Sequence, residues 1–301
     1  RNITINLREI VKHMPKRSHP MDVTRTIVSV LGLEDKETNN NSPEANMKKA
    51  IRIFAKAPTA IAAFFRARKG KNVIPPKKNL SFSENFFYMC FGKVPSKEIV
   101  KAFDVSLILY AEHSFNVSTF TARTITSSLS DIHGAITGAI ASLKGPLHGG
   151  ANEEVMHMMN KIKKPENALK WINKTLDKKE VVMGFGHRVY KKGDSRVPTM
   201  EKYFKKVSKV KSDKKFIKIY EIVKKVMIDR KNIHPNVDYP TGPTYHLMGF
   251  DTDFFTPIFV ISRITGWSAH IMEQHAANKL IRPLSKYSGP DHRKVMLLNQ
   301  R

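Results

Sequence analysis

The chain has 301 residues, 41% of them hydrophobic, which is enough for one large domain or two modest ones with a buried core. A single cysteine, Cys90, excludes a disulfide framework and any multi-cysteine metal site, and no apolar run approaches the roughly 20 residues that span a bilayer. The formal net charge of +26 favours polyanionic partners, among them nucleic acids and phosphorylated small molecules.

Helical periodicity dominates the first half of the chain. Residues 71–80 contain two adjacent prolines and predict a loop. Within residues 95–110, apolar residues recur at helical spacing, and this predicted helix leads to His113. The segment 122–143 is rich in Ala, Ser, Thr and Gly, and we expect a helix there that packs closely on its neighbours. Because alternating strand patterns are scarce throughout, the sequence predicts an all-α fold.

A histidine, His148, stands between a rigid Gly-Pro turn and a glycine pair, directly before the helical pattern of residues 151–162. The positive end of a helix dipole disfavours protonation of a histidine, so this side chain is expected to be neutral at pH 7. A neutral imidazole can donate a hydrogen bond to a substrate oxygen and stabilise an enolate. The alternative is a histidine that only packs at the start of the helix.

A second candidate site is the segment 184–196, in which His187 lies among several cations, including Lys191 and Arg196. The segment lacks the third glycine of a dinucleotide-binding fingerprint. Its glycines instead predict a bend that brings backbone N–H groups close to a ligand, and its cations suit a carboxylate-rich substrate. A basic surface loop without a ligand is the alternative.

Lysine is concentrated in the segment 202–231, where apolar residues recur at helical spacing between the charges. This pattern predicts a pair of amphipathic helices with a solvated basic face. No specific nucleic-acid partner is predicted from it. A basic helical protein that binds nucleic acid or another anion without catalysis remains an alternative to an enzyme.

The last two candidates are Asp238 and Arg263. Asp238 lies among Pro and Gly residues in the segment 235–243, which predicts a rigid turn with either a general base or a capping residue. Arg263 lies within residues 255–277, which are apolar on most sides and predict a buried helix. A buried cation is costly unless it is paired or binds an anion. The histidine spacing predicts no metal site.

Several segments, in this order, resemble the citrate synthase family: residues 109–113, 144–150, 184–190, 235–238, 262–263 and 281–283. Two further segments, 239–250 and 266–274, resemble the 2-methylcitrate synthase branch of that family more than typical citrate synthases. The resemblance implies a two-domain helical homodimer. Its large domain would comprise residues 1–148 and 244–301, and its small domain residues 149–243.

Relative to the family, we expect an N-terminal portion to be missing from this chain, which begins with Arg1. An inactive fragment that keeps the motifs is therefore a further alternative. The single cysteine and the lack of a signal-peptide pattern predict a cytoplasmic protein with no membrane partner.

The resemblance implies that propionyl-CoA or acetyl-CoA is condensed with oxaloacetate and that CoA is released, an acyl transfer in which the acyl group becomes an alkyl group. No cofactor or metal is implied, since acyl-CoA is a substrate. The catalytic residues would be Asp238 as the base, His148 as the enolate donor and His187 at the ketone. Oxaloacetate would be held by His113, Arg196, Arg263 and, from the other subunit, Arg282. CoA would lie near Gly184, Phe185, Gly186 and Lys191.

Overall fold

The computed structural model describes residues 1–190, 192–291 and 293–301. Its elements are α1 (Ile5–His13), α2 (Pro20–Leu33), α3 (Pro43–Ala67), α4 (Phe82–Phe91), α5 (Lys97–Tyr110), α6 (Val117–Ser127), α7 (Ile132–Leu143), α8 (Ala151–Ile162), α9 (Pro165–Asp177), α10 (Val197–Val210), α11 (Lys215–Lys231), α12 (Asp238–Met248), η1 (Thr252–Phe254), α13 (Phe255–Ala276) and η2 (Leu298–Gln300). Within those ranges, the extended pairing is limited to an isolated bridge between Phe185 and Pro235. The predicted all-α class is confirmed.

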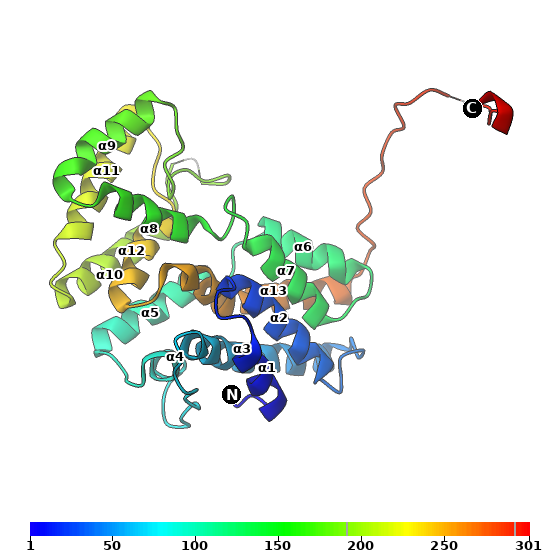
Figure 1. Ribbon diagram of the computed structural model, residues 1–301, viewed down its shortest axis with the longest axis horizontal. Coiled ribbons are helices and arrows are strands. Elements are labelled where there is room, and N and C mark those ends of the chain that lie inside the picture. Colours follow the sequence, from blue (N-terminus) through cyan, green and yellow to red (C-terminus); the bar gives the residue numbers. More distant parts are fainter. Residues whose placement is uncertain (191, 292) are drawn as a thin grey trace.

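The helices form two groups (Figure 1). Helices α8 to α12 gather at the left of the view, where α9 packs on α11 and α8 packs on α12. Helices α1, α2, α3, α6, α7 and α13 form the other group, in which α6 packs on both α7 and α13. Helix α5 contacts α10 of the first group and α13 of the second, so it connects the two.

Helix α13 runs through the second group and contacts α2, α3, α5, α6 and α7. It is buried along most of its length, as the apolar pattern of residues 255–277 predicts. No helix in the described ranges, α13 included, is long and apolar enough to cross a membrane. The predicted amphipathic pair is also confirmed, since α10 and α11 bury Phe204, Val207, Ile219 and Val223 and expose most of their lysines.

The segment 122–143 differs from the prediction, because it contains parts of two helices, α6 and α7, which pack on each other. Helix α6 ends before Leu129, whose φ is +66°. The carboxylate of Asp131 then caps α7 by accepting hydrogen bonds from the backbone N–H groups of His133 and Gly134. A segment of uniform composition is thus divided into two helices, because α6 ends at the positive φ of Leu129 and Asp131 then caps α7.

The predicted turn at residues 235–243 was wrong after its first few residues, because α12 begins at Asp238. Pro240 lies in the first turn, where a backbone N–H has no partner within the helix, so its missing donor costs nothing. Pro243 is tolerated further along, and the hydroxyls of Thr241 and Thr244 donate to carbonyls one turn back. Asp238 is therefore held at a helix N-terminus.

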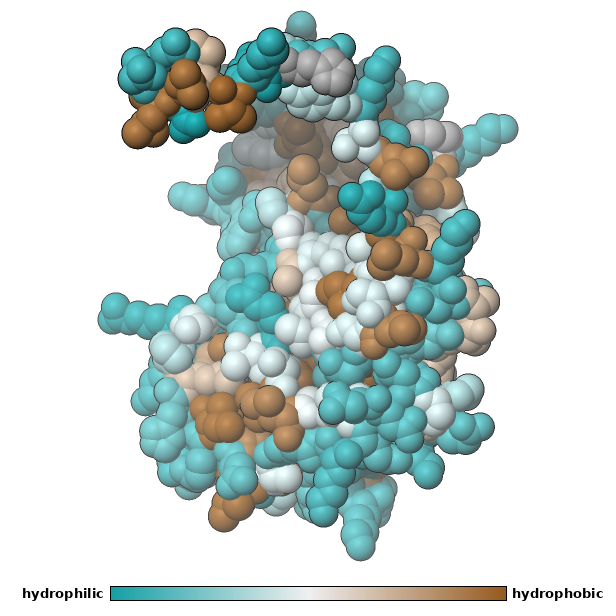
Figure 2. Space-filling view, turned by 90° about the vertical axis from the view of Figure 1, so that its right-hand side faces the viewer, coloured by the Kyte–Doolittle hydropathy of each residue, from teal (hydrophilic) through white to brown (hydrophobic). Residues whose placement is uncertain are grey.

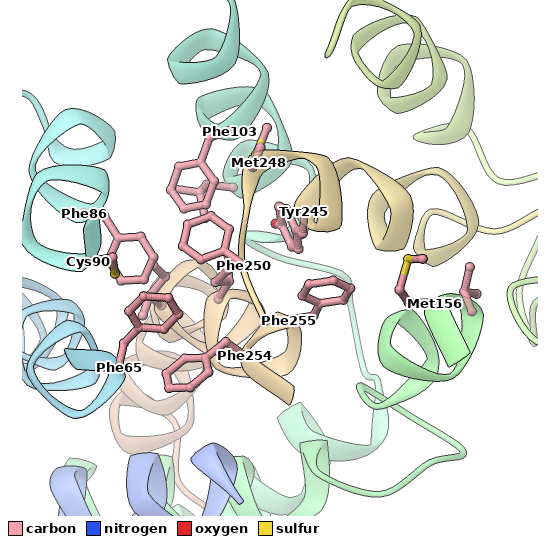
Figure 3. Close-up of a cluster of buried hydrophobic side chains, with 14 of the residues drawn as sticks. Phe65, Phe86, Cys90, Phe103, Met156, Tyr245, Met248, Phe250, Phe254 and Phe255 are labelled. Atoms are coloured by element: carbon pink, nitrogen blue, oxygen red, sulfur yellow. The ribbon is translucent and has the colours of Figure 1, made fainter. Parts of the chain in front are cut away.

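An aromatic cluster anchors the connection from α12 to α13 (Figure 3). The ring of Phe250, which follows α12, lies 5.1 Å from Phe91 and 5.8 Å from both Phe86 and Phe103, measured between ring centroids. Cys90 is buried beside these rings, and burial raises the pKa of its thiol. Because one packed cluster holds both helices, it fixes the relative positions of Asp238 and the residues of α13.

Hydrophobic side chains remain exposed on the outer side of α6 and in the C-terminal tail. Val117 and Phe120 are 62% and 49% exposed, and Leu284 and Leu298 are 89% and 85% exposed. Figure 2 shows the side of the molecule that lies at the right of Figure 1, where brown hydrophobic residues lie between polar ones. The tail leaves the end of α13 and extends away from the rest of the chain (Figure 1).

Candidate active site

A cavity of about 530 Å³ lies where α5, α13 and the loops after α5 and α9 meet the start of α12. Most of the residues singled out from the sequence line it. They are His113, His148, Gly184, Phe185, Gly186, His187, Arg196, Asp238 and Arg263. Residues more than 100 positions apart in the sequence are thus gathered around one space.

Of the described residues that line the cavity, Asp238 alone carries a carboxylate. The buried hydroxyl of Tyr110 donates a hydrogen bond to its Oδ1 at 2.5 Å. Burial raises the pKa of Asp238 to about 6, although the hydrogen bond from Tyr110 and the charges of Arg196 and Arg263 oppose that rise. A carboxylate with this pKa is mostly ionised at pH 7 and still basic enough to accept a proton.

The ring of His148 is held by Ser118 at the start of α6. The backbone N–H of Ser118 donates to Nε2 at 3.3 Å, and the Ser118 hydroxyl lies 2.8 Å from the same nitrogen. Since a backbone N–H can only donate, we assign Nε2 as an acceptor and place the ring proton on Nδ1. Burial, aided by the charge of Arg263, lowers the pKa of His148 to about 4, so the ring is neutral at pH 7. Burial, rather than the helix dipole, is the main cause of this lowered pKa.

His113 and His187 lie edge to face in the cavity, with ring centroids 5.1 Å apart. Nε2 of His113 is 3.1 Å from the hydroxyl of Tyr190. Nδ1 of His187 accepts the backbone N–H of Val189 at 3.0 Å, which assigns Nε2 as the donor of a neutral ring. Burial and the nearby charge of Arg196 lower the pKa of His113 to about 4. His113 is therefore a neutral donor at pH 7.

Arg196 is fixed by a buried partner, Asp194. Its Nε and Nη2 donate to the two carboxylate oxygens of Asp194 at 2.9 and 2.7 Å. Asp194 also accepts the backbone N–H of Val237 at 3.0 Å, which ties the arginine loop to the residue before Asp238. Such a bidentate pair holds the guanidinium in one orientation beside the cavity.

Arg263 is 2% exposed and lines the same cavity. Its Nε donates to the carbonyl of Tyr110 at 2.6 Å, and its guanidinium lies over the ring of Phe259. Within the described ranges, no carboxylate comes within ion-pair distance of it. Burial and the neighbouring Arg196 lower the pKa of Arg263 to about 10, which still leaves it charged at pH 7. A buried and unpaired cation that faces a cavity is what an anionic ligand requires.

The glycine loop forms another wall of the cavity. Gly184 and Gly186 have φ values of +83° and +78°, as the predicted bend requires. The N–H of Gly186 donates to the carbonyl of His234, and the carbonyl of Gly184 accepts the N–H of Asn236. The ring of Phe185 packs against Tyr239 of α12. The loop is thus attached to the segment that carries Asp238.

Two predicted site residues are not placed in the cavity. Lys191 lies outside the described residues. Arg282 lies in the exposed C-terminal tail and does not line the cavity of its own chain. The resemblance assigned Arg282 to the site of a second subunit, and that assignment remains a prediction.

Sequence reasoning missed Tyr110, Ser118 and Asp194 as parts of the site. Tyr110 is the last residue of α5 and His113 lies three residues on, in the loop that follows, but the contact of Tyr110 with Asp238 joins segments 128 residues apart. Asp194 lies two residues before Arg196, and this spacing is a usable signal for a local ion pair. Ser118 contacts His148 through both its backbone N–H and its hydroxyl, and the sequence carries no signal for a contact between residues 30 positions apart.

The cavity therefore combines a carboxylate base, neutral imidazole donors and arginines that can bind carboxylates. These are the groups needed to remove a proton from a weakly acidic carbon and to hold a second, anionic reactant beside it. No cluster of three or more metal-binding side chains was found in the part of the chain that the structure describes. Fold and site together define a helical enzyme for acid–base chemistry on an anionic substrate.

The chain belongs to the citrate synthase family. The family model for the citrate synthase C-terminal domain matches residues 1–284. A citrate synthase of Mycolicibacterium smegmatis is 51% identical over 98% of this chain and 79% of its own length. A 2-methylcitrate synthase of Mycobacterium tuberculosis is also 51% identical, over 97% of this chain and 74% of its own length.

Solved structures of the family superpose closely on this chain. The crystal structure of a citrate synthase from Thermotoga maritima has a TM-score of 0.86 and 36% identity, covering all of this chain and 80% of that one. A citrate synthase from Thermoplasma acidophilum, solved as a ternary complex with carboxymethyl coenzyme A and oxaloacetate, has a TM-score of 0.88 and 32% identity. The superposition covers all of this chain and 81% of the Thermoplasma acidophilum chain.

Proposed function

We propose that this protein condenses an acyl-CoA, either acetyl-CoA or propionyl-CoA, with oxaloacetate and releases CoA. The observation that supports this best is the placement of Asp238, with its raised pKa, beside the buried and unpaired Arg263 in one cavity. The Asp238 carboxylate can remove a proton from the acyl-CoA, and the Arg263 guanidinium can bind a carboxylate of oxaloacetate. Relatives at about half identity, named for these two synthase activities, support the same reaction.

In the first step, the Asp238 carboxylate removes a proton from the α-carbon of the thioester. Nδ1–H of the neutral His148 donates a hydrogen bond to the thioester oxygen, on which negative charge develops. A neutral donor of low pKa suits this role, because it stabilises the enolate without giving up its proton. The contact from Tyr110 holds the Asp238 carboxylate in place for the transfer.

In the second step, the enolate carbon attacks the ketone carbon of oxaloacetate. His187 polarises the ketone oxygen and protonates the alkoxide that forms. Arg196, Arg263 and His113 hold the carboxylates, and the bidentate contact with Asp194 keeps Arg196 oriented. Water then hydrolyses the thioester, which releases CoA. The steps use side chains only, so we propose that no further cofactor takes part.

The acyl-CoA is proposed to lie along the glycine loop, with Gly184, Phe185, Gly186 and Lys191 near the CoA portion. The choice between an acetyl and a propionyl group depends on one methylene, which is worth only about 1–3 kcal/mol of discrimination. In reaction terms, the acyl group becomes an alkyl group on transfer. We therefore class the activity as an acyltransferase that accepts either substrate.

We further propose that the two helix groups are the two domains of the enzyme, divided near residues 148 and 243. The first boundary falls in the loop before α8 and the second inside α12. The active enzyme is proposed to be a cytoplasmic homodimer in which Arg282 of each tail completes the site of the other subunit. The exposed hydrophobic residues of α6 and of the tail support this assembly.

The test is release of free thiol from acetyl-CoA and from propionyl-CoA, each with oxaloacetate. We expect release with at least one of them. Asp238→Asn and His148→Ala should each lower kcat by about 10²–10⁴-fold while the circular dichroism spectrum stays unchanged. Asp251→Asn, which removes a carboxylate from a surface ion pair with Lys69, serves as the control and should retain activity.

Absence of thiol release with both substrates would contradict the proposed reaction for this chain. Wild-type rates in Asp238→Asn or His148→Ala would contradict the roles assigned to those residues. A preference for one acyl group changes only the substrate assignment and leaves the reaction intact.

A further inference from the structure

A second cavity, of about 720 Å³, lies between α10, α11 and the strip formed by residues 192–195 and 234–235. Among the described residues, five lysines line it: Lys192, Lys202, Lys205, Lys206 and Lys224. Ligand sites for small molecules have volumes of roughly 300–1,000 Å³, so this cavity can hold a molecule the size of a nucleotide. Of the described residues assigned above to contact with the substrates, none lines it; Asp194, which orients Arg196 from behind, does.

The two carboxylates of this cavity are already neutralised. Glu201 accepts hydrogen bonds from Lys224 at 2.5 Å and from the hydroxyl of Tyr220 at 2.9 Å, and it pairs with Lys205 at 3.0 Å. Although burial opposes it, these donors hold the pKa of Glu201 below its ordinary value. Asp194 is taken up by Arg196 in the way described above. Neither acid offers an uncompensated negative charge to the cavity.

Among the described residues, three of the five lysines have no acidic partner. Lys192, Lys202 and Lys206 form no ion pair with any carboxylate that the structure describes, whereas Lys205 and Lys224 are held at the wall by Glu201. The cavity wall therefore carries two lysines held in place by Glu201 and three lysines without a described carboxylate partner. Phosphate groups are the ligands that such a set of ammonium groups binds.

Much of the remaining wall is apolar, and Ser195 and His234 add polar groups to it. Val197, Pro198, Ile228 and Pro235 line the cavity between the lysines. An inorganic anion alone would leave this surface uncovered. A ligand that joins a phosphorylated part to a flat apolar part would cover both kinds of wall.

We propose that this cavity is a binding site for a phosphorylated small molecule of nucleotide size, distinct from the condensation cavity. Two short segments, residues 192–196 and 234–238, separate the two spaces. Lys192 and Pro235 line the lysine cavity, whereas Arg196 and Asp238 line the condensation cavity. The proposal does not rest on the proposed reaction, because binding can be measured without turnover.

The test uses ATP without magnesium as the probe, with binding to the full chain measured by titration calorimetry at fixed ionic strength. The double variant Lys202→Ala/Lys206→Ala should bind ATP at least about tenfold more weakly than wild type, because two charge-assisted contacts are lost. The control is Lys209→Ala/Lys225→Ala, which removes the same total charge, one lysine from α10 and one from α11, at positions that do not line the cavity. Its affinity should stay within about twofold of wild type.

Equal losses in both double variants would overturn the proposal, since binding would then reflect the net charge of the whole chain. No measurable binding to wild type would also overturn it. Arg188→Ala provides a third comparison, because Arg188 lines the condensation cavity. A loss confined to Arg188→Ala would place ATP in that cavity and refute a second site.

A kinetic readout separates a free nucleotide from the nucleotide end of the CoA substrate. In the absence of ATP, Lys202→Ala/Lys206→Ala should leave the KM for acyl-CoA within about twofold of wild type. A rise in that KM that parallels the loss of ATP affinity would assign the cavity to the substrate and overturn a distinct site.

Discussion

Two neighbouring aspartates, Asp194 and Asp238, have pKa values shifted in opposite directions, and their contacts explain the difference. Burial raises the pKa of both. In Asp194, the bidentate contact with Arg196 and two backbone N–H groups outweighs burial and holds the pKa below its ordinary value. Asp238 receives one hydroxyl contact from Tyr110 and more distant positive charges, so its pKa stays raised, at about 6. Asp194 is thereby held in its charged form as the partner of Arg196, whereas the raised pKa of Asp238 suits the proton transfer proposed for it.

The contact from Tyr110 predicts a pH effect that a purely structural tyrosine would not produce. Removal of the hydroxyl in Tyr110→Phe withdraws a hydrogen bond from the charged form of Asp238, so the pKa of that carboxyl should rise by about one unit. The acid limb of the pH profile of kcat should move to higher pH. Activity should therefore fall most near pH 6 and least above pH 8, as measured by thiol release.

Tyr245→Phe is the matched control, because Tyr245 is also fully buried but its hydroxyl donates to Ser106 rather than to Asp238. Its acid limb should stay in place. If Tyr110→Phe lowers kcat equally at all pH values, the hydroxyl does not tune the base and the interpretation fails.

Among the structural elements, the loop that carries Gly184 is held closely between α8 and α12. A Cβ atom added at Gly184 would lie 2.6 Å from Cγ2 of Val155 and 2.9 Å from Cβ of Tyr239. At Gly186, two residues on, the nearest atom is Cγ2 of Ile233 at 3.6 Å, an ordinary contact. Both glycines have positive φ, so they differ in space and not in backbone conformation.

This difference predicts two distinct effects on stability. Gly184→Ala should lower the free energy of unfolding by about 3 kcal/mol or more, since it adds steric overlap to an unfavourable φ. Gly186→Ala should lower it by about 1 kcal/mol, from the backbone alone. Urea unfolding monitored by circular dichroism compares the two variants directly. Equal losses would show that the contacts with α8 and α12 do not constrain the loop.

At the scale of the whole molecule, charge and exposed hydrophobic surface are separated. Many of the lysines lie on the solvated sides of α10 and α11, whereas Val117 and Phe120 leave an apolar strip on α6, in the other group of helices. An exposed apolar strip of this kind is typical of a surface that another chain covers. It supports the proposed homodimer and places the candidate dimer contact on α6, away from the basic helices α10 and α11.

The proposed dimer predicts the effect of a charge placed on α6. Wild type at micromolar concentration should elute from a sizing column at twice the mass of one chain, and Phe120→Glu should shift it toward the monomer, because a carboxylate would be buried without a partner. Leu169→Glu is the control: Leu169 on α9 is 54% exposed, close to the 49% of Phe120, but lies in the other group of helices. A monomeric wild type would contradict the dimer.

Much of the site could be predicted from local sequence. The all-α class, the buried helix with Arg263, the glycine bend and the pairing of His148 with a following helix all follow from periodicity and from residues a few positions apart. The interpretation of residues 235–243 as a turn failed because prolines in the first turn of a helix look the same in sequence as prolines in a loop. The break between α6 and α7 was missed because composition hid a single capping aspartate.

Local sequence was enough to identify which chemical groups are present and, except for Asp238, whether they lie in a helix or a loop, since these depend on contacts within a few residues. Only the tertiary structure decided the state of those groups. Burial and contacts from segments far along the chain set the pKa of Asp238, the tautomer of His148 and the absence of a described acidic partner for Arg263. Desolvation and long-range hydrogen bonds arise only when distant segments pack together, and for that reason no local pattern records them.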